Sequence, residues 1–274
     1  MAIKLIALDI DGTIVDSDNN ISTANEKAIK KIISKGILVA LVTGRHRGGT
    51  KKVMDTVGLD MKKTPLVISN GALVYLGGDI VWKDFLTADE ADKVIKFTTK
   101  IPGVVTTIYQ PNHVHLHCNS PFDRDWLEDR LKAFEIDRFS VADTPDDLAR
   151  EDVTKIMLIT EDSETAPQVF EMWPEELSNL KCTHSYPYLC EINSSTCDKG
   201  LGLKILCEKL GILPEEVLAV GDGENDISML TLAGNAVFVR HYDYIPKLPP
   251  HVQVTPKGFE KEATAWVLEK YMGI

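Results

Sequence analysis

A short apolar stretch near the N-terminus ends abruptly in two carboxylates. Ile3-Lys4-Leu5-Ile6-Ala7-Leu8 has the length of a buried strand, and Asp9-Ile10-Asp11-Gly12-Thr13 follows it directly. Side chains two residues apart in a strand point the same way, so Asp9 and Asp11 emerge together at its carboxyl end, where open α/β sheets bind ligands. Two like charges this close are costly unless a cation or a shared proton offsets them. Alone, the pattern is equally typical of an acidic turn.

Three distant stretches place polar residues in comparable positions. Thr43-Gly44-Arg45 follows the apolar run Gly36–Val42, and Gly221-Asp222-Gly223-Glu224-Asn225-Asp226 follows the run Val217–Val220. Asp198-Lys199-Gly200 opens a helical pattern. Because parallel strands present their carboxyl ends at one edge of a sheet, the two strand-end stretches are expected beside the first acidic pair.

Each of these stretches also has an ordinary structural interpretation. Thr43 can cap a helix, Lys199 in a first helical turn is usually on the surface, and the helix dipole favours an acidic first turn. The dipole explains one or two acids, but it explains poorly three acids converging on the sheet edge that carries Asp9. The complete set, rather than any single member, predicts a functional site.

In this order and context, the four stretches resemble the motifs of the haloacid dehalogenase superfamily of aspartate-nucleophile phosphatases. The nearest resemblance is to its Cof-like sugar-phosphatase branch, which carries a type IIB cap. The match covers the two ends of the chain, whereas the middle third matches only in length and position. The resemblance implies an α/β fold with a doubly wound, Rossmann-like parallel-sheet core and an inserted α+β cap. We therefore predict a core of residues 1–84 and 192–274 and a cap of residues 85–191.

The pattern between the motifs agrees with this division. Thr23-Ala24-Asn25-Glu26 is a candidate capping box for a helix ending near Gly36, and the turn Gly77-Gly78-Asp79 predicts a hairpin. From about Phe85 to about Glu191, helices alternate with polar strands, which predicts an antiparallel sheet with helices on one face. The expected elements are strands at Val104–Tyr109, His113–Cys118, Thr154–Ile159 and Tyr188–Ile192, and helices at Asp123–Phe134 and Thr165–Trp173.

Three histidines alternate with apolar residues in the expected strand His113–Cys118. His113, His115 and His117 share one face of this strand. Imidazoles at this spacing could bind zinc, but a polar face of an antiparallel sheet is the commoner explanation. A third interpretation is that the histidine face looks toward the core domain and contributes to substrate selection.

The resemblance also implies a division of roles among the site residues. Asp9 is the expected nucleophile, which gives an aspartyl-phosphate, and Asp11 is the expected general acid and base. The Mg²⁺ ligands are expected from Asp9, Asp222 and the backbone carbonyl of Asp11, with Asp226 supporting them from outside the ligand set. The expected phosphate-binding groups are Lys199, Thr43, Asn225 and the backbones of Ile10 and Gly44.

Composition narrows the class of protein. With a formal net charge of −11 over 274 residues, the chain is not expected to bind nucleic acid or an anionic membrane. No apolar run approaches membrane-spanning length and no signal-peptide pattern is present, so a cytoplasmic location is expected. Five cysteines without a Cys-x-x-Cys pair indicate reduced thiols.

We therefore expect a hydrolase of phosphoric monoesters that uses Mg²⁺ and acts on small phosphorylated metabolites, with sugar phosphates foremost. Two alternatives stay open. One is a phosphohexomutase-type phosphotransferase, although no basic cluster for a second phosphate is evident in residues 85–191. The other is a catalytically silent metabolite-binding protein, which would not need a paired nucleophile and acid. The expected state is a monomer or a weak homodimer.

Overall fold

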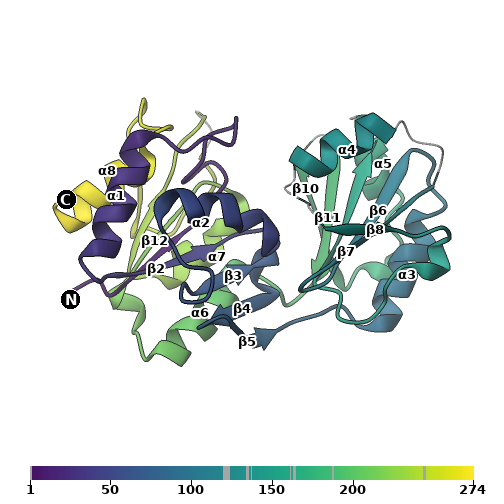
Figure 1. Ribbon diagram of the computed structural model, residues 1–274, viewed down its shortest axis with the longest axis horizontal. Helices are drawn as coiled ribbons and strands as arrows, with labels where there is room; N and C mark the ends of the chain where they lie inside the picture. Colours follow the sequence, from purple (N-terminus) through teal and green to yellow (C-terminus); the bar gives the residue numbers. More distant parts are fainter. Residues whose placement is uncertain are drawn as a thin grey trace. The chain divides into compact units, whose positions relative to one another are not determined.

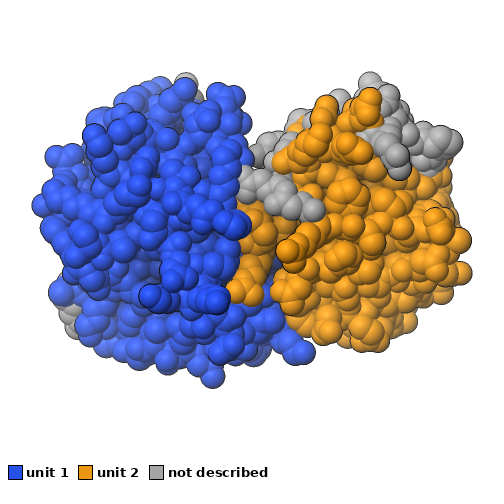
Figure 2. All heavy atoms as spheres, viewed as in Figure 1, with its two compact units in different colours: residues 1–45, 50–83, 198–274 blue, residues 46–49, 84–197 orange. Residues whose placement is uncertain are grey.

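The computed structural model describes residues 2–119, 124–133, 136, 138–160, 162, 165–186, 188–242 and 245–274. The chain divides into two compact units (Figure 2). The core unit comprises residues 1–45, 50–83 and 198–274, and the inserted unit comprises residues 46–49 and 84–197. The predicted boundary after residue 191 falls inside strand β11 (Leu189–Ser194), which pairs with its neighbour as far as Ser194.

A single eight-stranded sheet forms the centre of the core unit (Figure 1). Its order is β14-β13-β12-β1-β2-β3-β4-β5, and the six strands from β14 to β3 run parallel. The last two strands form the predicted hairpin and run antiparallel. The bounds are β1 Leu5–Leu8, β2 Leu38–Val42, β3 Leu66–Ile68, β4 Leu73–Leu76, β5 Asp79–Lys83, β12 Val217–Gly221, β13 Asn235–Phe238 and β14 Val252–Val254.

Helices cover both faces of this sheet, as expected for a doubly wound core. Helices α6 (Lys199–Leu210) and α7 (Ile227–Leu232) pack on the face that carries Leu5 and Ala7. Helix α1 (Thr23–Ser34) lies beside α2 (Lys51–Val57) and α8 (Ala263–Met272) (Figure 1).

The cap of α1 differs from the predicted one. The hydroxyl of Ser22, not that of Thr23, accepts the backbone N–H of Asn25, at 3.1 Å. The capping residue must keep an extended backbone, and Ser22 has that conformation whereas Thr23 is already helical. The helix therefore starts one residue earlier than predicted, at Thr23, and its apolar positions keep the expected spacing.

The inserted unit is built on a six-stranded sheet with the order β10-β11-β9-β6-β7-β8. All neighbouring pairs are antiparallel except β7 with β8, which are parallel. The predicted sheet was purely antiparallel and lacked β8 and β10. The bounds are β6 Val104–Tyr109, β7 Val114–Cys118, β8 Phe139–Val141, β9 Lys155–Thr160 and β10 Leu180–Tyr186. The first and last residues of the predicted helix Asp123–Phe134 lie outside the described residues.

Helices pack on both faces of this second sheet, so the prediction of helices on one face is wrong. Helices α3 (Ala88–Thr98) and α5 (Thr165–Glu171) share an apolar cluster with Val104 and Ile108 of β6. Helix α4 (Arg124–Ala133) contributes to a separate cluster with the alternate residues of β6. The reason is topological: β7 to β8 and β9 to β10 are parallel crossovers that run in opposite directions along the sheet, and right-handed crossovers then place their helices on opposite faces.

The histidines of β7 face the side of the sheet that carries α3 and α5, because His115 and His117 lie opposite Ile108 and Thr106 of β6. The alternate side chains Val114 and Leu116 pack in the apolar cluster that includes α4. The histidine face therefore shares its side with two helices. It is not the helix-free face that the selectivity interpretation assumed.

Hydrogen bonds join two of these histidines in one chain of groups. Gln110 donates its amide N–H to the carbonyl of Glu151 at 2.7 Å, which leaves its oxygen facing Nε2 of His115 at 3.0 Å. Nε2 of His115 therefore carries a proton, and Nδ1 accepts from the Ser140 hydroxyl at 3.0 Å. The same hydroxyl accepts from Nε2 of His113 at 3.0 Å. Burial, followed by the neighbouring His113, lowers the pKa of His115 and keeps this ring neutral.

The two ends of the inserted segment 84–197 are tied to each other. The hydroxyl of Thr196 donates to a carboxylate oxygen of Asp84 at 2.7 Å, although the two residues are 112 positions apart in the sequence. The chain thus leaves the core sheet after β5 and comes back to α6 through two neighbouring segments. Among the described residues, none of the helices has the length and apolar content needed to cross a bilayer.

Candidate active site

The central strand of the core sheet carries the first predicted site residue. Asp9 follows β1 and its backbone N–H donates to the carbonyl of Val220 in β12 at 3.0 Å, so this carboxylate is placed between two parallel strands. Only 4% of Asp9 is exposed. Burial is the largest cause that raises the pKa of Asp9 well above its usual range, and the nearby Asp226 and Asp222 raise it further. Lys199 acts in the opposite direction.

Lys199 supplies the positive charge that this buried carboxylate needs. Its Nζ lies 2.8 Å from Oδ1 of Asp9 and 2.6 Å from Oδ1 of Asp226, with 1% of the lysine exposed. Asp198 caps α6 by accepting the N–H of Leu201 at 2.7 Å, which fixes the first helical turn that holds the lysine. Burial lowers the pKa of Lys199, but the two carboxylates outweigh burial and the pKa lies above its usual range.

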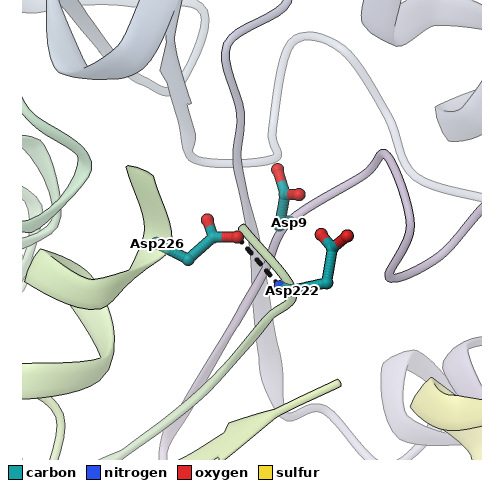
Figure 3. Close-up of side chains that lie close together, drawn as sticks. All are labelled: Asp9, Asp222 and Asp226. Carbon is teal, nitrogen blue, oxygen red and sulfur yellow. Dashed lines mark hydrogen bonds between the residues drawn. The ribbon is translucent and has the colours of Figure 1, made fainter. Parts of the chain in front are cut away.

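Both oxygens of Asp226 are already engaged by the protein. Oδ1 accepts from Lys199, and Oδ2 accepts the backbone N–H groups of Asp222 at 2.9 Å and Gly223 at 2.8 Å. Figure 3 shows the hydrogen bond from the Asp222 backbone and the three carboxylates around it. Burial raises the pKa of Asp226, while Lys199 opposes this effect. Asp226 therefore orients the turn after β12 and the lysine.

Asp222 approaches the first motif closely enough to require a glycine there. A Cβ at Gly12 would lie 2.1 Å from Oδ2 of Asp222, and φ of Gly12 is +72°, in the left-handed region. Thr13 donates to Oδ1 of Asp222 at 3.4 Å. On the other side, Nε2 of His241 lies 3.3 Å from Oδ2 of Asp222 and donates to the carbonyl of Gly12 at 2.7 Å. No sequence signal had singled out His241.

The second and third strand ends supply neutral polar groups. Thr43 is fully buried, its N–H donates to the carbonyl of Val67 at 2.8 Å, and its hydroxyl accepts the N–H of Arg45 at 3.1 Å. A Cβ at Gly44 would lie 2.9 Å from the side-chain oxygen of Asn70, so a larger residue would crowd that side chain. The exposed Asn225 donates to the same Asn70 oxygen at 3.2 Å.

The structure also locates the remaining predicted residues. The Ile10 side chain is fully buried, and its carbonyl accepts from Thr13 at 3.2 Å and Ile14 at 2.9 Å. The Asp11 side chain is 47% exposed and lies against Arg45, whose Nη2 is 2.6 Å from Oδ1. Arg45 was not among the predicted site residues, because surface arginines are common. Its contact with Asp11 is what distinguishes it.

The acidic residues provide a suitable donor set for a divalent cation. One carboxylate oxygen from each of Asp9, Asp222 and Asp226 lies within 4.8 Å of the other two. An oxygen-only set of this kind suits a hard cation such as Mg²⁺. Three carboxylates lie around the one ammonium group of Lys199, so the cluster holds more negative charge than this lysine balances. Both Asp226 oxygens already accept short hydrogen bonds, whereas the contacts to Asp222 are longer, at 3.4 and 3.3 Å, and Asp9 is held by Lys199 through one oxygen. Asp9 and Asp222 are therefore better placed than Asp226 to supply metal ligands. The residues present fit the ion.

Comparison with known proteins decides the family. The sequence matches the haloacid dehalogenase-like hydrolases over residues 6–248. The chain belongs to this family. As a haloacid dehalogenase-like hydrolase it has the predicted Rossmann-like core and α+β insertion, and the expected enzyme class of phosphoric monoester hydrolase agrees with this membership.

Individual relatives match along almost the whole chain. A protein of Buchnera aphidicola subsp. Schizaphis graminum named "Putative phosphatase" is 29% identical over 92% of this chain and 89% of its own length. The 5-amino-6-(5-phospho-D-ribitylamino)uracil phosphatase YwtE of Bacillus subtilis is 26% identical over 98% of both chains. A haloacid dehalogenase-like hydrolase from Bacteroides thetaiotaomicron superposes with a TM-score of 0.83 at 22% identity, covering 98% of this chain and 99% of its own.

Proposed function

We propose that this protein is a Mg²⁺-dependent phosphatase of small phosphorylated metabolites, foremost sugar phosphates, and that it acts through an aspartyl-phosphate. The observation that carries the proposal is the position of Lys199 between the buried carboxylates of Asp9 and Asp226, with Asp222 beside them. A buried lysine shared by carboxylates at the ligand-binding edge of the sheet is suited to receive an anionic group.

Asp9 is the proposed nucleophile. Its carboxylate attacks phosphorus, the bond from phosphorus to the substrate oxygen breaks, and a water molecule then hydrolyses the resulting acyl phosphate. The contact with Lys199 at 2.8 Å orients one carboxylate oxygen and stabilises the charged form against burial. Near neutral pH this charge balance matters, because only the ionised carboxylate attacks.

Asp11 is the proposed general acid and base. It is two residues from Asp9 and is more exposed, so it can reach a leaving oxygen that points toward solvent. It protonates that oxygen as the ester bond breaks and later takes a proton from the attacking water. Arg45 fixes the direction of its carboxylate through contacts with both oxygens.

Asp9, Asp222 and the backbone carbonyl of Asp11 would hold Mg²⁺. When bound, this cation neutralises charge between an anionic phosphate and an anionic nucleophile. The chain's own residues position these ligands: Asp226 holds the turn after β12, while Thr13 and His241 contact the two oxygens of Asp222.

The phosphate oxygens would be bound by Lys199, the hydroxyl of Thr43, the amide of Asn225 and the backbone N–H groups of Gly44 and Ile10. Lys199 contributes a compact charge, and the others contribute directional hydrogen bonds. The burial of Thr43 and Lys199 keeps these donors in fixed positions.

A small polyhydroxylated substrate is supported by two considerations. The net charge of −11 disfavours a polyanionic substrate unless local positive charge is supplied. The name of the Bacillus subtilis relative describes action on a uracil derivative whose ribityl chain, a sugar-alcohol chain, carries the phosphate.

The proposal is tested by phosphate release from a panel of phosphorylated metabolites, with and without Mg²⁺. We expect turnover of at least one sugar or polyol phosphate, its loss in EDTA, and its return when Mg²⁺ is restored. The matched control is Asp9→Asn loaded in the same way. Absence of turnover by the Mg²⁺-loaded wild-type protein across the panel, together with tight binding of one member, would instead identify a silent binding protein.

A further inference from the structure

A polar cavity lies in the core unit. It has a volume of about 340 Å³ and is lined by Arg240, His241, Tyr242, Lys257 and Glu260. Two permanent cations and a histidine therefore face one carboxylate, in a protein whose net charge is −11. A local excess of positive charge in an acidic protein is an electrostatic preference for anions.

The cavity lies at the carboxyl edge of the core sheet. Arg240 follows β13, and its N–H donates to the hydroxyl of Thr255 at 2.9 Å. Thr255 follows β14 and donates its own N–H to the carbonyl of Phe238 at 3.0 Å. Two strand ends are thereby tied together, and Lys257 comes two residues later. This is the edge at which open α/β sheets bind ligands.

Arg240 has an unsatisfied donor in this location. Its Nε is buried, and it has no hydrogen-bond partner within the part of the chain that the structure describes. A buried donor without a hydrogen-bond partner is energetically costly. A guanidinium stays charged at any ordinary pH, so Arg240 cannot avoid this cost by losing a proton. A bound oxyanion would bring negative charge and hydrogen-bond acceptors to this guanidinium.

The ionised Glu260 balances only part of the positive charge. Its carboxylate accepts the N–H of Gly258 at 3.0 Å, and backbone hydrogen bonds, followed by His241 and Lys257, lower its pKa. Glu260 is therefore held on its own loop as an anion, and it is the one acid among the five residues that line the cavity. Tyr242, which is 80% exposed, adds an aromatic surface at the cavity.

His241 connects this cavity with the catalytic site. The same ring that lines the cavity donates to the Gly12 carbonyl and lies 3.3 Å from Asp222. A group bound in the cavity would thus be separated from the proposed metal ligand Asp222 by a single imidazole.

We propose that the cavity of Arg240, His241 and Lys257 is a second oxyanion site, which takes a phosphate or carboxylate group. The anion comes from one of two sources: a second acidic group on the substrate, or a separate anionic metabolite. Its binding residues are distinct from the Asp9 and Lys199 set.

Binding is tested directly by following backbone amide NMR shifts of the metal-free protein during titration with inorganic sulfate. We expect saturable shifts at Arg240, His241 and Tyr242 in the wild-type protein, and their loss in Arg240→Gln/Lys257→Gln. The exposed Lys257→Gln alone should weaken them without threatening the fold. Lys204→Gln, which removes an exposed charge on α6, is the matched control. Shifts confined to the Asp9 region, or shifts that persist in the double variant, would overturn the site.

The source of the bound anion is identified by kinetics on a sugar bisphosphate and the corresponding monophosphate. This experiment rests on the proposed phosphatase function, whereas the NMR titration does not. If the anion belongs to the substrate, the double variant should lose about tenfold in kcat/KM on the bisphosphate alone, the value of one charge-assisted contact. Sulfate binding without a selective kinetic loss would assign the site to a separate metabolite. An equal loss on both substrates with unaltered sulfate shifts would overturn the proposal in favour of a structural role.

Discussion

Arg45 donates hydrogen bonds to both carboxylate oxygens of Asp11. Its Nη2 lies 2.6 Å from Oδ1 and its Nε lies 3.0 Å from Oδ2, while Nη2 also reaches the side-chain oxygen of Asn19 at 2.7 Å. A planar guanidinium that binds two oxygens fixes direction as well as charge. The proposed acid and base thus has a preset orientation before any substrate arrives.

Arg45→Gln should therefore impair the step that needs a proton. We expect kcat to fall about 10- to 100-fold on an alkyl phosphate, as for a weakened general acid. The loss should be much smaller for p-nitrophenyl phosphate, whose leaving group needs no proton. Steady-state kinetics on both esters measures this, with the exposed Lys52→Gln as control. An equal rise in KM for both esters without a change in kcat would instead identify Arg45 as a phosphate clamp.

Asp9→Asn should abolish turnover and leave the fold intact. The amide keeps the size of the side chain and removes one negative charge from a cluster of three acids, while Lys199 keeps its partner Asp226. Phosphate release by the purified, Mg²⁺-loaded variant should fall to background. Near-normal release would show that another group is the nucleophile.

The stability of the same variant relative to wild type should depend on pH. Burial raises the pKa of Asp9 in the folded state, so the native protein binds this proton more tightly than the unfolded chain does. The resulting stability is present below the usual carboxyl pKa and is lost as pH rises through the raised folded value. The melting temperature of metal-free Asp9→Asn minus that of wild type should therefore increase from pH 5 to pH 8. A constant difference would contradict the raised pKa.

Lys199→Met should destabilise the protein as well as inactivate it. It leaves Asp9 and Asp226 buried without their shared cation, and removing one partner of a buried ion pair costs about 3–5 kcal/mol. Urea denaturation of the metal-free proteins measures this cost. In an Asp9→Asn background the same change should cost less, because one unpaired carboxylate has been removed. Equal costs in the two backgrounds would show that Lys199 and Asp9 are not coupled.

Replacing His113, His115 and His117 together should leave both the substrate profile and the activity on a small aryl phosphate unaltered, because His115 and His117 lie on the side of the sheet that carries α3 and α5. The proposed catalytic residues all belong to the core unit, so the chemistry should survive. The variant should also melt at a lower temperature, because the bonds to Ser140, Gln110 and the Ala142 carbonyl are lost. Kinetics on a sugar phosphate panel, calorimetry and metal analysis check these points. Stoichiometric zinc in the wild-type protein would favour the metal-site interpretation. An unaltered substrate profile would rule out the interpretation that these histidines contribute to substrate selection.

The sequence predicted the core well because its signals are local and repeated. Apolar runs that end in polar residues mark parallel strands, so the positions of Asp9, Thr43 and Asp222 at one sheet edge followed from the pattern. His241 could not be found in this way. It comes near Asp222 only because β13 pairs with β12, and that pairing is a long-range contact without a local signal.

The inserted unit was predicted less well for similar reasons. β8 has three residues at the edge of its sheet and two of them are exposed, so it has little apolar pattern to detect. β10 carries polar residues along most of its length, Lys181, Thr183 and His184 among them. The face on which α4 packs depends on the direction of a crossover, which neither the helix nor its flanking strands encode.

The hydrogen bond between Thr196 and Asp84 has a consequence for protein engineering and for the evolution of the inserted unit. Two chain segments that part and rejoin at one point can be severed there and bridged with a few residues, as at tolerated sites of domain insertion. The entropic cost of closing a loop grows only with the logarithm of its length. The core therefore loses little more free energy to an insertion of 114 residues than to a short turn. Different modules can therefore be grafted between the same two residues while the catalytic residues stay where they are.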